Sequence, residues 1–453
     1  MRLSTLPLFI ALLVASPLAA AQRPVAQDAK LEAAVDAYLR PLIDLHLFQG
    51  AVLIARGDQV VFEKAYGFAN LELKVRNTPA QVFRIASLSK PFTEVALGHL
   101  SEERKLSLGD PLSRYLPNFP RGQSITLDML RTHRAGIPSL NSIPFDEEAT
   151  QPNSLDSLVR RIAREPLAFE PGSARRYSNG GYALLAAVIE KASGKSYADY
   201  MERAVFEPLG LRDTRHETDQ MVVMRRAYGY TASPEARHAL VLAPYQQMMT
   251  KTGGGSLVST VRDLHRFLLA MNRDNAIQAS TWRTLFPPDS VFSYQGRCPG
   301  FNVWMGRDFV RDVDAVVLCN NYAAGMVGNV GDDLLLMARG GHAETPRWRA
   351  DVAADSAASA RFLGTYAPPR GALPFGDDPV QIRWRRGDLV LFRGEAPLDV
   401  LVPQGGDAYL LRNLWSEMRL TAEAGKVKAT MRPLWFKTDP VPLEPIVSPS
   451  TPR

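Results

Sequence analysis

The stretch Val82-Phe83-Arg84-Ile85-Ala86-Ser87-Leu88-Ser89-Lys90-Pro91 decides the interpretation of this chain. Its first residues are mostly apolar, as in a buried strand, and residues 91–100 carry apolar side chains at helical spacing. Pro91 is tolerated in the first turn of a helix, because the N–H that it lacks would have no partner there. The sequence therefore predicts a strand that turns into a helix, with Ser87 and Lys90 at the turn.

Ser87 and Lys90 are three residues apart, so they are neighbours on one helix face. A neutral Lys90 amine can accept the Ser87 hydroxyl proton and make a nucleophile. The helix N-terminus adds N–H groups and a positive dipole end, which favour a developing oxyanion. Ser-x-x-Lys is also short enough to arise by chance, and a capped surface helix is the alternative. The catalytic interpretation therefore depends on what accompanies the motif.

A second motif, Tyr177-Ser178-Asn179, follows the turn signal Pro171-Gly172 and precedes an apolar helical run at 183–189. We expect it on a loop that enters a helix, where side chains project into a cleft. A tyrosine near a lysine can share or relay a proton, and an asparagine can orient the lysine or a substrate carbonyl. An aromatic anchor packed beside a helix start is the alternative.

Ser-x-x-Lys followed about ninety residues later by Tyr-x-Asn resembles the serine β-lactamase and penicillin-binding protein superfamily. The nearer branch holds the class C β-lactamases, D-alanyl-D-alanine carboxypeptidases, D-aminopeptidases and related esterases. The resemblance covers roughly residues 30–345 and is specific as a set. Further stretches that match the family are residues 48–54, 83–87, 105–111, 132–138, 254–260 and 263–264.

The resemblance implies an α+β fold, with a central antiparallel sheet flanked by helices. It implies that Ser87 attacks a carbonyl and forms an acyl-enzyme, while Lys90 and Tyr177 share the base role and Asn179 orients them. No metal ion or organic cofactor is expected for this chemistry. The seven histidines show no metal-ligand spacing either.

The family usually carries a third element, Lys or His, then any residue, then Gly, on a strand that lines the site. Lys251-Thr252-Gly253 has these letters, but Thr260 follows as a helix N-cap with Asp263 as its acidic partner, and an amphipathic helix follows them. A strand-borne motif should not lead straight into a helix. Gly341-His342 is better explained as a helix C-cap and loop.

Tyr294-Gln295-Gly296 is the better candidate for the third element, because a strand pair at 302–305 and 315–318 follows it. Tyr294, Gly296 and Arg297 are the predicted substrate-binding residues. The N–H groups of Ser87 and Arg297 are the candidates for the oxyanion hole. A tyrosine carries no positive charge at neutral pH, so the departure from Lys or His favours an ester or amide without an essential free carboxylate. Arg297 either compensates or is an ordinary exposed arginine.

The composition is that of a globular protein: 453 residues, 46% hydrophobic and 22% charged, long enough for two domains. The net charge is +6. No Lys/Arg run and no basic patch interleaved with aromatic residues stands out, which argues against nucleic-acid binding.

Residues 1–21 are typical of a secretory signal peptide, with Arg2, an apolar run at 6–15 and a small-residue cleavage site at 19–21. An uncleaved anchor is the alternative, but the run is short for a membrane span. We therefore expect a secreted or periplasmic protein without a stable membrane span after removal of the signal.

The predicted domains are a β-lactamase-like hydrolase domain at 22–350 and a small β-sandwich or barrel at 355–439. A proline-rich tail at 440–453 is expected to be disordered. The chain has only two cysteines, Cys298 and Cys319, which flank the predicted strand pair. Their pairing is left open between a cross-strand bridge and buried thiols.

The sequence thus predicts an exported serine hydrolase that acts on an ester, an amide or a D-amino-acid peptide. Its partner is a small-molecule or peptide substrate, and its oligomeric state is left open. A catalytically impaired binding protein with the β-lactamase fold is the alternative, motivated by the altered third element. A further idea is that the C-terminal β-domain itself binds a ligand or a cell-wall component.

Overall fold

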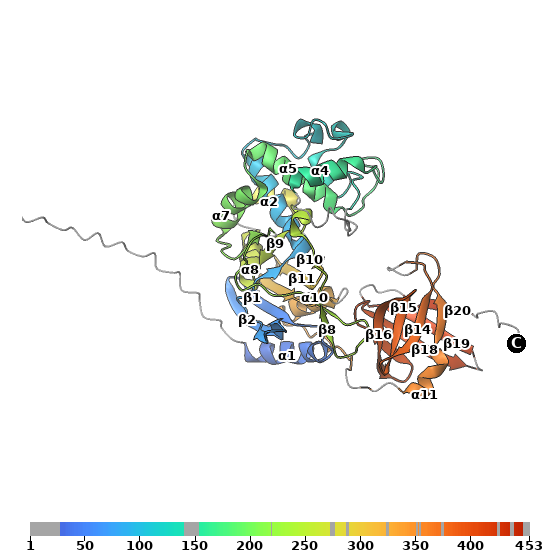
Figure 1. Cartoon of the computed structure of the whole chain (residues 1–453). Coiled ribbons are helices and arrows are strands. Elements are labelled where there is room, and N and C mark those ends of the chain that lie inside the picture. The colour runs from blue at the N-terminus through green and yellow to red at the C-terminus, as the bar shows by residue number, and fades with distance from the viewer. Residues whose placement is uncertain are drawn as a thin grey trace, which may run out of the picture.

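The computed structural model describes residues 28–139, 154–218, 220–271, 277–286, 290–322, 326–349, 352, 355–372, 376–423, 426–434 and 439–446. The predicted signal peptide, residues 1–21, lies outside this range. Within it, the chain forms an N-terminal domain built on an antiparallel sheet and a C-terminal β-barrel (Figure 1). The predicted α+β fold with an all-β domain after it is confirmed.

The central sheet joins strands from both ends of the N-terminal domain, in the order β10-β11-β12-β1-β2. Gly50 of β1 pairs with Cys319 of β12 on one side and with Tyr66 of β2 on the other. The strands are β1 (Gly50–Arg56), β2 (Gln59–Tyr66), β10 (Val291–Cys298), β11 (Phe301–Asp308) and β12 (Val313–Cys319).

Both faces of the sheet are covered, because alternate residues of β1 point to opposite sides. Val52 and Ile54 pack in a core with α1 (Ala29–Asp44) and α10 (Met326–Ala338). Leu53 and its neighbours pack in a second core beneath α2 (Ser89–Glu102) and α8 (Val261–Ala270). Since all of these positions are buried, β1 is a near-continuous apolar run rather than an alternating one.

A helical lobe lies beyond the second core (Figure 1). Its helices are α3 (Leu127–Arg131), α4 (Leu155–Arg164), α5 (Asn179–Ser193), α6 (Tyr197–Met201), α7 (Glu207–Leu209) and α9 (Ala279–Leu285). The described residues also form three smaller sheets: β3 (Phe68–Asn70) with β4 (Val75–Arg76), β5 (Phe83–Arg84) with β9 (Leu257–Ser259) and β6 (Arg215–His216), and β7 (Tyr230–Ala232) with β8 (Leu240–Leu242).

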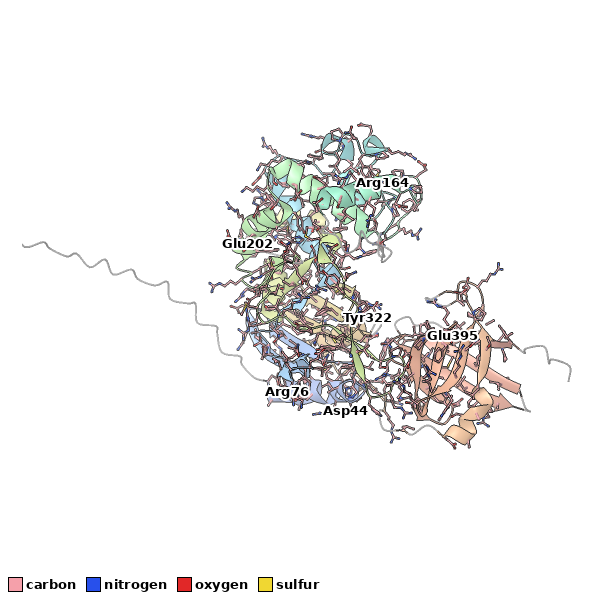
Figure 2. The ribbon with its side chains drawn as sticks, in the orientation of Figure 1. Asp44, Arg76, Arg164, Glu202, Tyr322 and Glu395 are labelled. Carbon is pink, nitrogen blue, oxygen red and sulfur yellow. The ribbon has the colours of Figure 1, made fainter. Side chains whose placement is uncertain are left out.

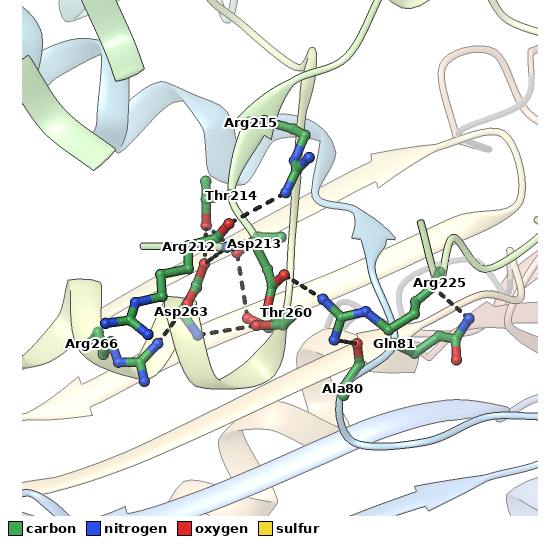
Figure 3. Close-up of polar contacts among 11 residues, drawn as sticks. Ala80, Gln81, Arg212, Asp213, Thr214, Arg215, Arg225, Thr260, Asp263 and Arg266 are labelled. Carbon is green, nitrogen blue, oxygen red and sulfur yellow. Dashed lines mark hydrogen bonds and ion pairs between the residues drawn. The ribbon is translucent and has the colours of Figure 1, made fainter. Parts of the chain in front are cut away.

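Helix α8 begins as its sequence predicts. The Thr260 side chain caps it by accepting from the Asp263 N–H at 3.3 Å. The Asp263 carboxylate accepts in turn from the Asp213 N–H at 2.7 Å and the Thr214 hydroxyl at 2.9 Å (Figure 3). This buried network holds the start of α8. The short strand β9 lies between Lys251-Thr252-Gly253 and α8, so the motif does not lead straight into the helix as the sequence predicts.

The C-terminal domain is a closed barrel of strands β13 to β20, which decides between the two predicted architectures. Val441–Ile446, assigned from sequence to the proline-rich tail, forms the last strand and closes the barrel against β13. Leu443 lies in the barrel core, so its burial outweighs the prolines around it. The strands are β13 (Gly364–Ala367), β14 (Val380–Arg385), β15 (Asp388–Arg393), β16 (Ala396–Gly405), β17 (Ala408–Leu411), β18 (Ser416–Glu423), β19 (Lys426–Pro433) and β20 (Val441–Ile446), preceded by α11 (Ser356–Ser359).

The barrel shares a hydrophobic core with the N-terminal domain. Phe392, Val402 and Trp415 pack in the same buried cluster as residues of α1, α10 and β12. Arg412, which is fully buried, donates to the carbonyl oxygens of Leu45 at 3.3 Å and Ser233 at 3.3 Å. The barrel is therefore held to the N-terminal domain by both apolar and polar contacts.

The two cysteines are buried thiols that are not bonded to each other. Cys298 of β10 pairs with Phe301 of β11, and Cys319 of β12 pairs with Asn302 on the other edge of β11. An intervening strand separates their backbones by about 10 Å, whereas a disulfide needs its Cα atoms within about 7 Å.

Both thiols are expected to stay unmodified by a thiol reagent in the native protein. Burial raises the pKa of Cys298 to about 12 and that of Cys319 to about 11, so neither forms the reactive thiolate at neutral pH. Titration with a chromogenic disulfide should count no thiol under native conditions and two in denaturant. A count of zero in denaturant without reductant would instead reveal a disulfide.

No helix in the described part of the chain combines the length and apolar character needed to cross a bilayer.

Candidate active site

Ser87 lies in a short 3-10 turn, Ala86–Leu88, between β5 and α2. Ala86 has a φ of 46°, a left-handed conformation that costs about 1–3 kcal/mol in a residue other than glycine. The Ser89 hydroxyl donates to the Ala86 carbonyl at 2.7 Å and accepts from the Leu257 N–H at 3.1 Å. These bonds hold the strained turn that presents Ser87, where the sequence predicts a strand-to-helix junction.

The Lys90 side chain is fully buried among three polar neighbours. Its Nζ lies 2.7 Å from Asn179 Oδ1, 2.6 Å from the Gly254 carbonyl oxygen and 3.4 Å from Ser87 Oγ. Burial lowers the pKa of Lys90 well below its ordinary value, and the nearby charge of Lys251 lowers it further. A neutral amine has two N–H groups for the two acceptors, so its lone pair remains for the Ser87 hydroxyl.

Tyr177 also contacts the Ser87 hydroxyl. Its hydroxyl oxygen is 2.7 Å from Ser87 Oγ, and Lys90 Nζ lies 4.8 Å from its ring centroid. Burial raises the pKa of Tyr177, so the phenol is protonated at neutral pH. Tyr177 can therefore accept or donate at Ser87 Oγ, which suits a shared proton.

His133 supports the Tyr177 loop, a role that the sequence did not suggest. Its ring lies 4.6 Å from the Tyr177 ring, and its Nδ1 accepts from the Ser178 N–H at 3.2 Å. Burial lowers the pKa of His133 to about 4, so at neutral pH the ring is neutral with its proton on Nε2. The Ser178 side chain then caps α5, which begins at Asn179.

Two glycines allow backbone to approach the site closely. Gly253 has a φ of 77°, and a Cβ there would lie 2.3 Å from the Tyr182 carbonyl oxygen. A Cβ at Gly296 would lie 2.5 Å from the Ile85 carbonyl oxygen and 2.9 Å from the Ser87 nitrogen. The peptide that joins Gly296 to Arg297 therefore runs beside the Ser87 backbone, as an oxyanion-hole strand requires.

The other two predicted substrate-binding residues lie in different places. The Arg297 side chain lines the cavity at Ser87 and donates to the Tyr322 hydroxyl at 2.9 Å. Figure 2 shows Tyr322 on the side of the N-terminal domain that faces the barrel. Tyr294 does not line this cavity but a neighbouring one on the same strand.

The cavity at Ser87 has a volume of about 630 Å³. Lys251 lines it, whereas Tyr294, the better sequence candidate for the third element, does not. The place of Lys251 beside Ser87 comes from the turn Met248–Lys251 and the glycines that follow. The residues that line the cavity are Ala86, Ser87, Tyr177, Asn179, Gln246, Lys251, Gly254, Gly255, Gln295, Arg297, Cys298, Pro299 and Tyr322.

A Lys251→Gln variant is expected to shift the pH dependence of Ser87 reactivity toward alkaline pH. Removal of the Lys251 charge removes one cause of the low pKa of Lys90, so the amine loses its proton only at higher pH. The rate of labelling by a fluorophosphonate, measured against pH, should show its rising limb displaced. Lys195→Gln, at an exposed lysine, serves as the control, and an unchanged limb in Lys251→Gln would contradict the coupling.

The beta-lactamase family model matches residues 35–297, more than half of the chain. Penicillin-binding protein 4* of Bacillus subtilis is 27% identical over 423 residues, which cover 83% of this chain and 90% of that protein. Teichoic acid D-alanine hydrolase of Staphylococcus aureus is 30% identical over 240 residues, or 51% of this chain and 58% of that protein.

Solved structures show the same fold. D-amino acid amidase from Ochrobactrum anthropi SV3 aligns with a TM-score of 0.61 at 22% identity, covering 69% of this chain and 99% of that one. An octameric penicillin-binding protein homologue from Pyrococcus abyssi aligns with a TM-score of 0.59 at 20% identity, covering 92% of this chain and 99% of that one. The family model matches the segment that carries Ser87, Lys90, Tyr177 and Asn179. This chain therefore belongs to the beta-lactamase family of serine hydrolases.

Proposed function

We propose that this chain is an exported serine hydrolase that forms an acyl-enzyme on Ser87 with an ester, an amide or a D-amino-acid peptide. The observation that carries the proposal is the buried Lys90 amine, held by Asn179 Oδ1 and the Gly254 carbonyl with Ser87 Oγ 3.4 Å away. Burial of a lysine amine costs stability when its hydrogen-bond acceptors are an amide and a carbonyl rather than a carboxylate, so a purely structural role does not explain these contacts. A base that must be neutral gains the low pKa that it needs.

In the proposed reaction, Ser87 Oγ attacks the substrate carbonyl while its proton passes to the Lys90–Tyr177 pair. The N–H groups of Ser87 and Arg297 stabilise the oxyanion. The same proton then goes to the leaving group as the carbonyl–heteroatom bond breaks. Water, or another acceptor, is deprotonated by the pair and releases the acyl group.

The substrate class rests on the relatives and on the charges in the cavity. Relatives named for D-alanine hydrolysis and D-amino acid amide hydrolysis favour a D-aminoacyl ester or amide. Lys251 and Arg297 line the cavity beside Ser87, so cationic side chains lie near the nucleophile although Tyr294 itself carries no charge. A substrate with an anionic group, such as a peptide carboxylate, therefore stays within the proposed class.

Intact-mass analysis after fluorophosphonate treatment tests the proposal. A single adduct on the mature protein, lost in Ser87→Ala, is the expected result. Absence of an adduct from a folded sample would favour the alternative of a catalytically impaired binding protein.

A further inference from the structure

A second cavity, of about 590 Å³, lies between the helical lobe and the first half of β10. Aromatic side chains form one of its walls and a polar cluster forms the other. Its lining residues are Glu94, Arg131, Thr132, His133, Arg175, Tyr182, Leu285, Phe286, Val291, Phe292, Ser293, Tyr294 and Phe309. None of them lines the cavity at Ser87, but Tyr294 lies two residues before Gly296 on β10 and His133 packs against Tyr177, so the two cavities are neighbours.

Strand β10 connects this second cavity to the nucleophile. Alternate residues of a strand share a face, so Phe292, Tyr294 and Gly296 form one row. Gly296 contacts the Ser87 backbone, and each step of two residues along a strand covers about 7 Å. The aromatic wall therefore begins about one such step from Ser87.

Tyr177 lies between Ser87 and a residue that lines the second cavity. Its hydroxyl contacts Ser87 Oγ at 2.7 Å, and its ring lies 4.6 Å from the ring of His133, which lines the second cavity. A substrate group that passes Tyr177 from the reacting carbonyl thus enters this cavity.

The two walls differ in what they leave for a ligand. On the polar wall, the Glu94 carboxylate accepts from the Tyr182 hydroxyl at 2.6 Å and from Arg131 at 3.1 Å, so these groups bind one another. On the aromatic wall, the Phe292 ring lies 5.6 Å from that of Phe286 and 6.5 Å from that of Tyr294, and all three are only half-buried. Half-buried rings in a row offer faces and edges to another flat apolar group.

The direction of proton transfer decides which part of the substrate lies there. In acylation the Ser87 Oγ–carbon bond forms and the bond from carbon to the leaving heteroatom breaks. The Ser87 proton, held by Lys90 and Tyr177, ends on that heteroatom and yields a neutral alcohol or amine. Lys90 is fully buried whereas Tyr177 is exposed, so Tyr177 is the group that can deliver the proton to the substrate. The leaving group must therefore lie on the Tyr177 side of Ser87, which is the side of the second cavity.

We propose that the second cavity binds an aromatic or bulky apolar leaving group of the substrate, with Phe292 and Tyr294 as its contact residues. This assignment rests on the proposed function, because it presumes acylation of Ser87. It gives Tyr294 a role in specificity as an apolar contact, in place of the cation that the family usually carries there.

Ethyl acetate and benzyl acetate test the assignment, because both give the same acetyl-enzyme and differ only in the leaving alcohol. We expect kcat/KM for benzyl acetate to exceed that for ethyl acetate by at least about tenfold, the discrimination that an apolar pocket supplies. Benzyl alcohol should slow fluorophosphonate labelling of Ser87, whereas ethanol at the same concentration should not.

A Phe292→Ala variant removes one of the two contact rings, so it should bring the benzyl-to-ethyl ratio closer to one. Val310→Ala, at an exposed apolar residue outside the cavity lining, should keep the wild-type ratio. Equal turnover of the two acetates, or protection by neither alcohol, with normal labelling would overturn the cavity assignment alone. Failure of labelling itself would overturn the proposed function, and the assignment with it.

Discussion

Replacing Lys90 with methionine is expected to lower kcat/KM for an ester substrate by about 10³-fold, within the range for loss of a general base. The variant keeps Ser87 and Tyr177 but loses the amine whose lone pair faces Ser87 Oγ. Methionine has a similar volume and no charge, so it suits the fully buried position.

Lys90→Met should still fold, because two opposing effects act on its stability. The substitution removes a buried polar group, which is favourable, but leaves Asn179 Oδ1 and the Gly254 carbonyl with one partner fewer, which costs about 1–3 kcal/mol each. The melting temperature and the far-UV circular dichroism check this point. A loss of activity that follows a loss of fold would not support the base role.

Lys191→Met provides a matched control, since Lys191 is an exposed lysine in α5. It should retain wild-type kcat/KM. Retention of more than about a tenth of wild-type activity in Lys90→Met would assign the base role to Tyr177 alone.

Replacing Arg412 with methionine is expected to lower the free energy of unfolding by about 3–5 kcal/mol, because three carbonyl acceptors each lose a partner at a cost of about 1–3 kcal/mol. Arg412 is fully buried between the barrel and the N-terminal domain. It donates to the carbonyl oxygens of Leu45, Ser233 and Ala236, and it is the nearby cation for the buried Asp399. Urea denaturation followed by tryptophan fluorescence measures the loss.

The loss should be larger at pH 8 than at pH 5. Burial raises the pKa of Asp399 to about 6, against about 3.9 for an unfolded chain, and the charge of Arg412 holds it from rising further. A folded carboxyl with a raised pKa binds its proton more tightly than the unfolded one, so its contribution to stability falls as pH rises through that range. Without Arg412 the pKa of Asp399 rises further. The buried carboxylate without its nearby cation is then present at pH 8 but not at pH 5, so the variant loses more stability at pH 8.

Arg419→Met is the control for Arg412→Met, because Arg419 is half-exposed on the barrel and its ion pairs are on the surface. It should change stability by less than about 1 kcal/mol. An equal loss in both variants, or a loss in Arg412→Met that does not depend on pH, would contradict the role of Arg412 as the counter-charge. The hydrophobic core shared by the two domains argues against the idea that the barrel is an independent binding module, because separation of the domains would expose that core.

Local sequence determined the parts of this protein whose cause lies within a few residues. Ser87 and Lys90 are brought together by the pitch of one helix, and the apolar run at 51–55 is typical of a strand covered on both faces. The Thr260 and Asp263 pair predicts the start of α8 by its capping chemistry alone. The meeting of Tyr177 and Asn179 with Lys90 came from a family resemblance, since nothing local joins residues about ninety positions apart.

Only the tertiary structure decided which cations and which strands meet. Lys251 reaches the cavity through a 3-10 turn and a glycine loop, whereas Tyr294, on a genuine strand, lies in the neighbouring cavity. Val441–Ile446 becomes a strand because the edges of β13 and β19 need a partner to close the barrel, although its prolines indicate a tail. In each case the structure is decided by burial against, and pairing with, residues that are far away in the chain. The local propensity of a segment carries no information about those contacts.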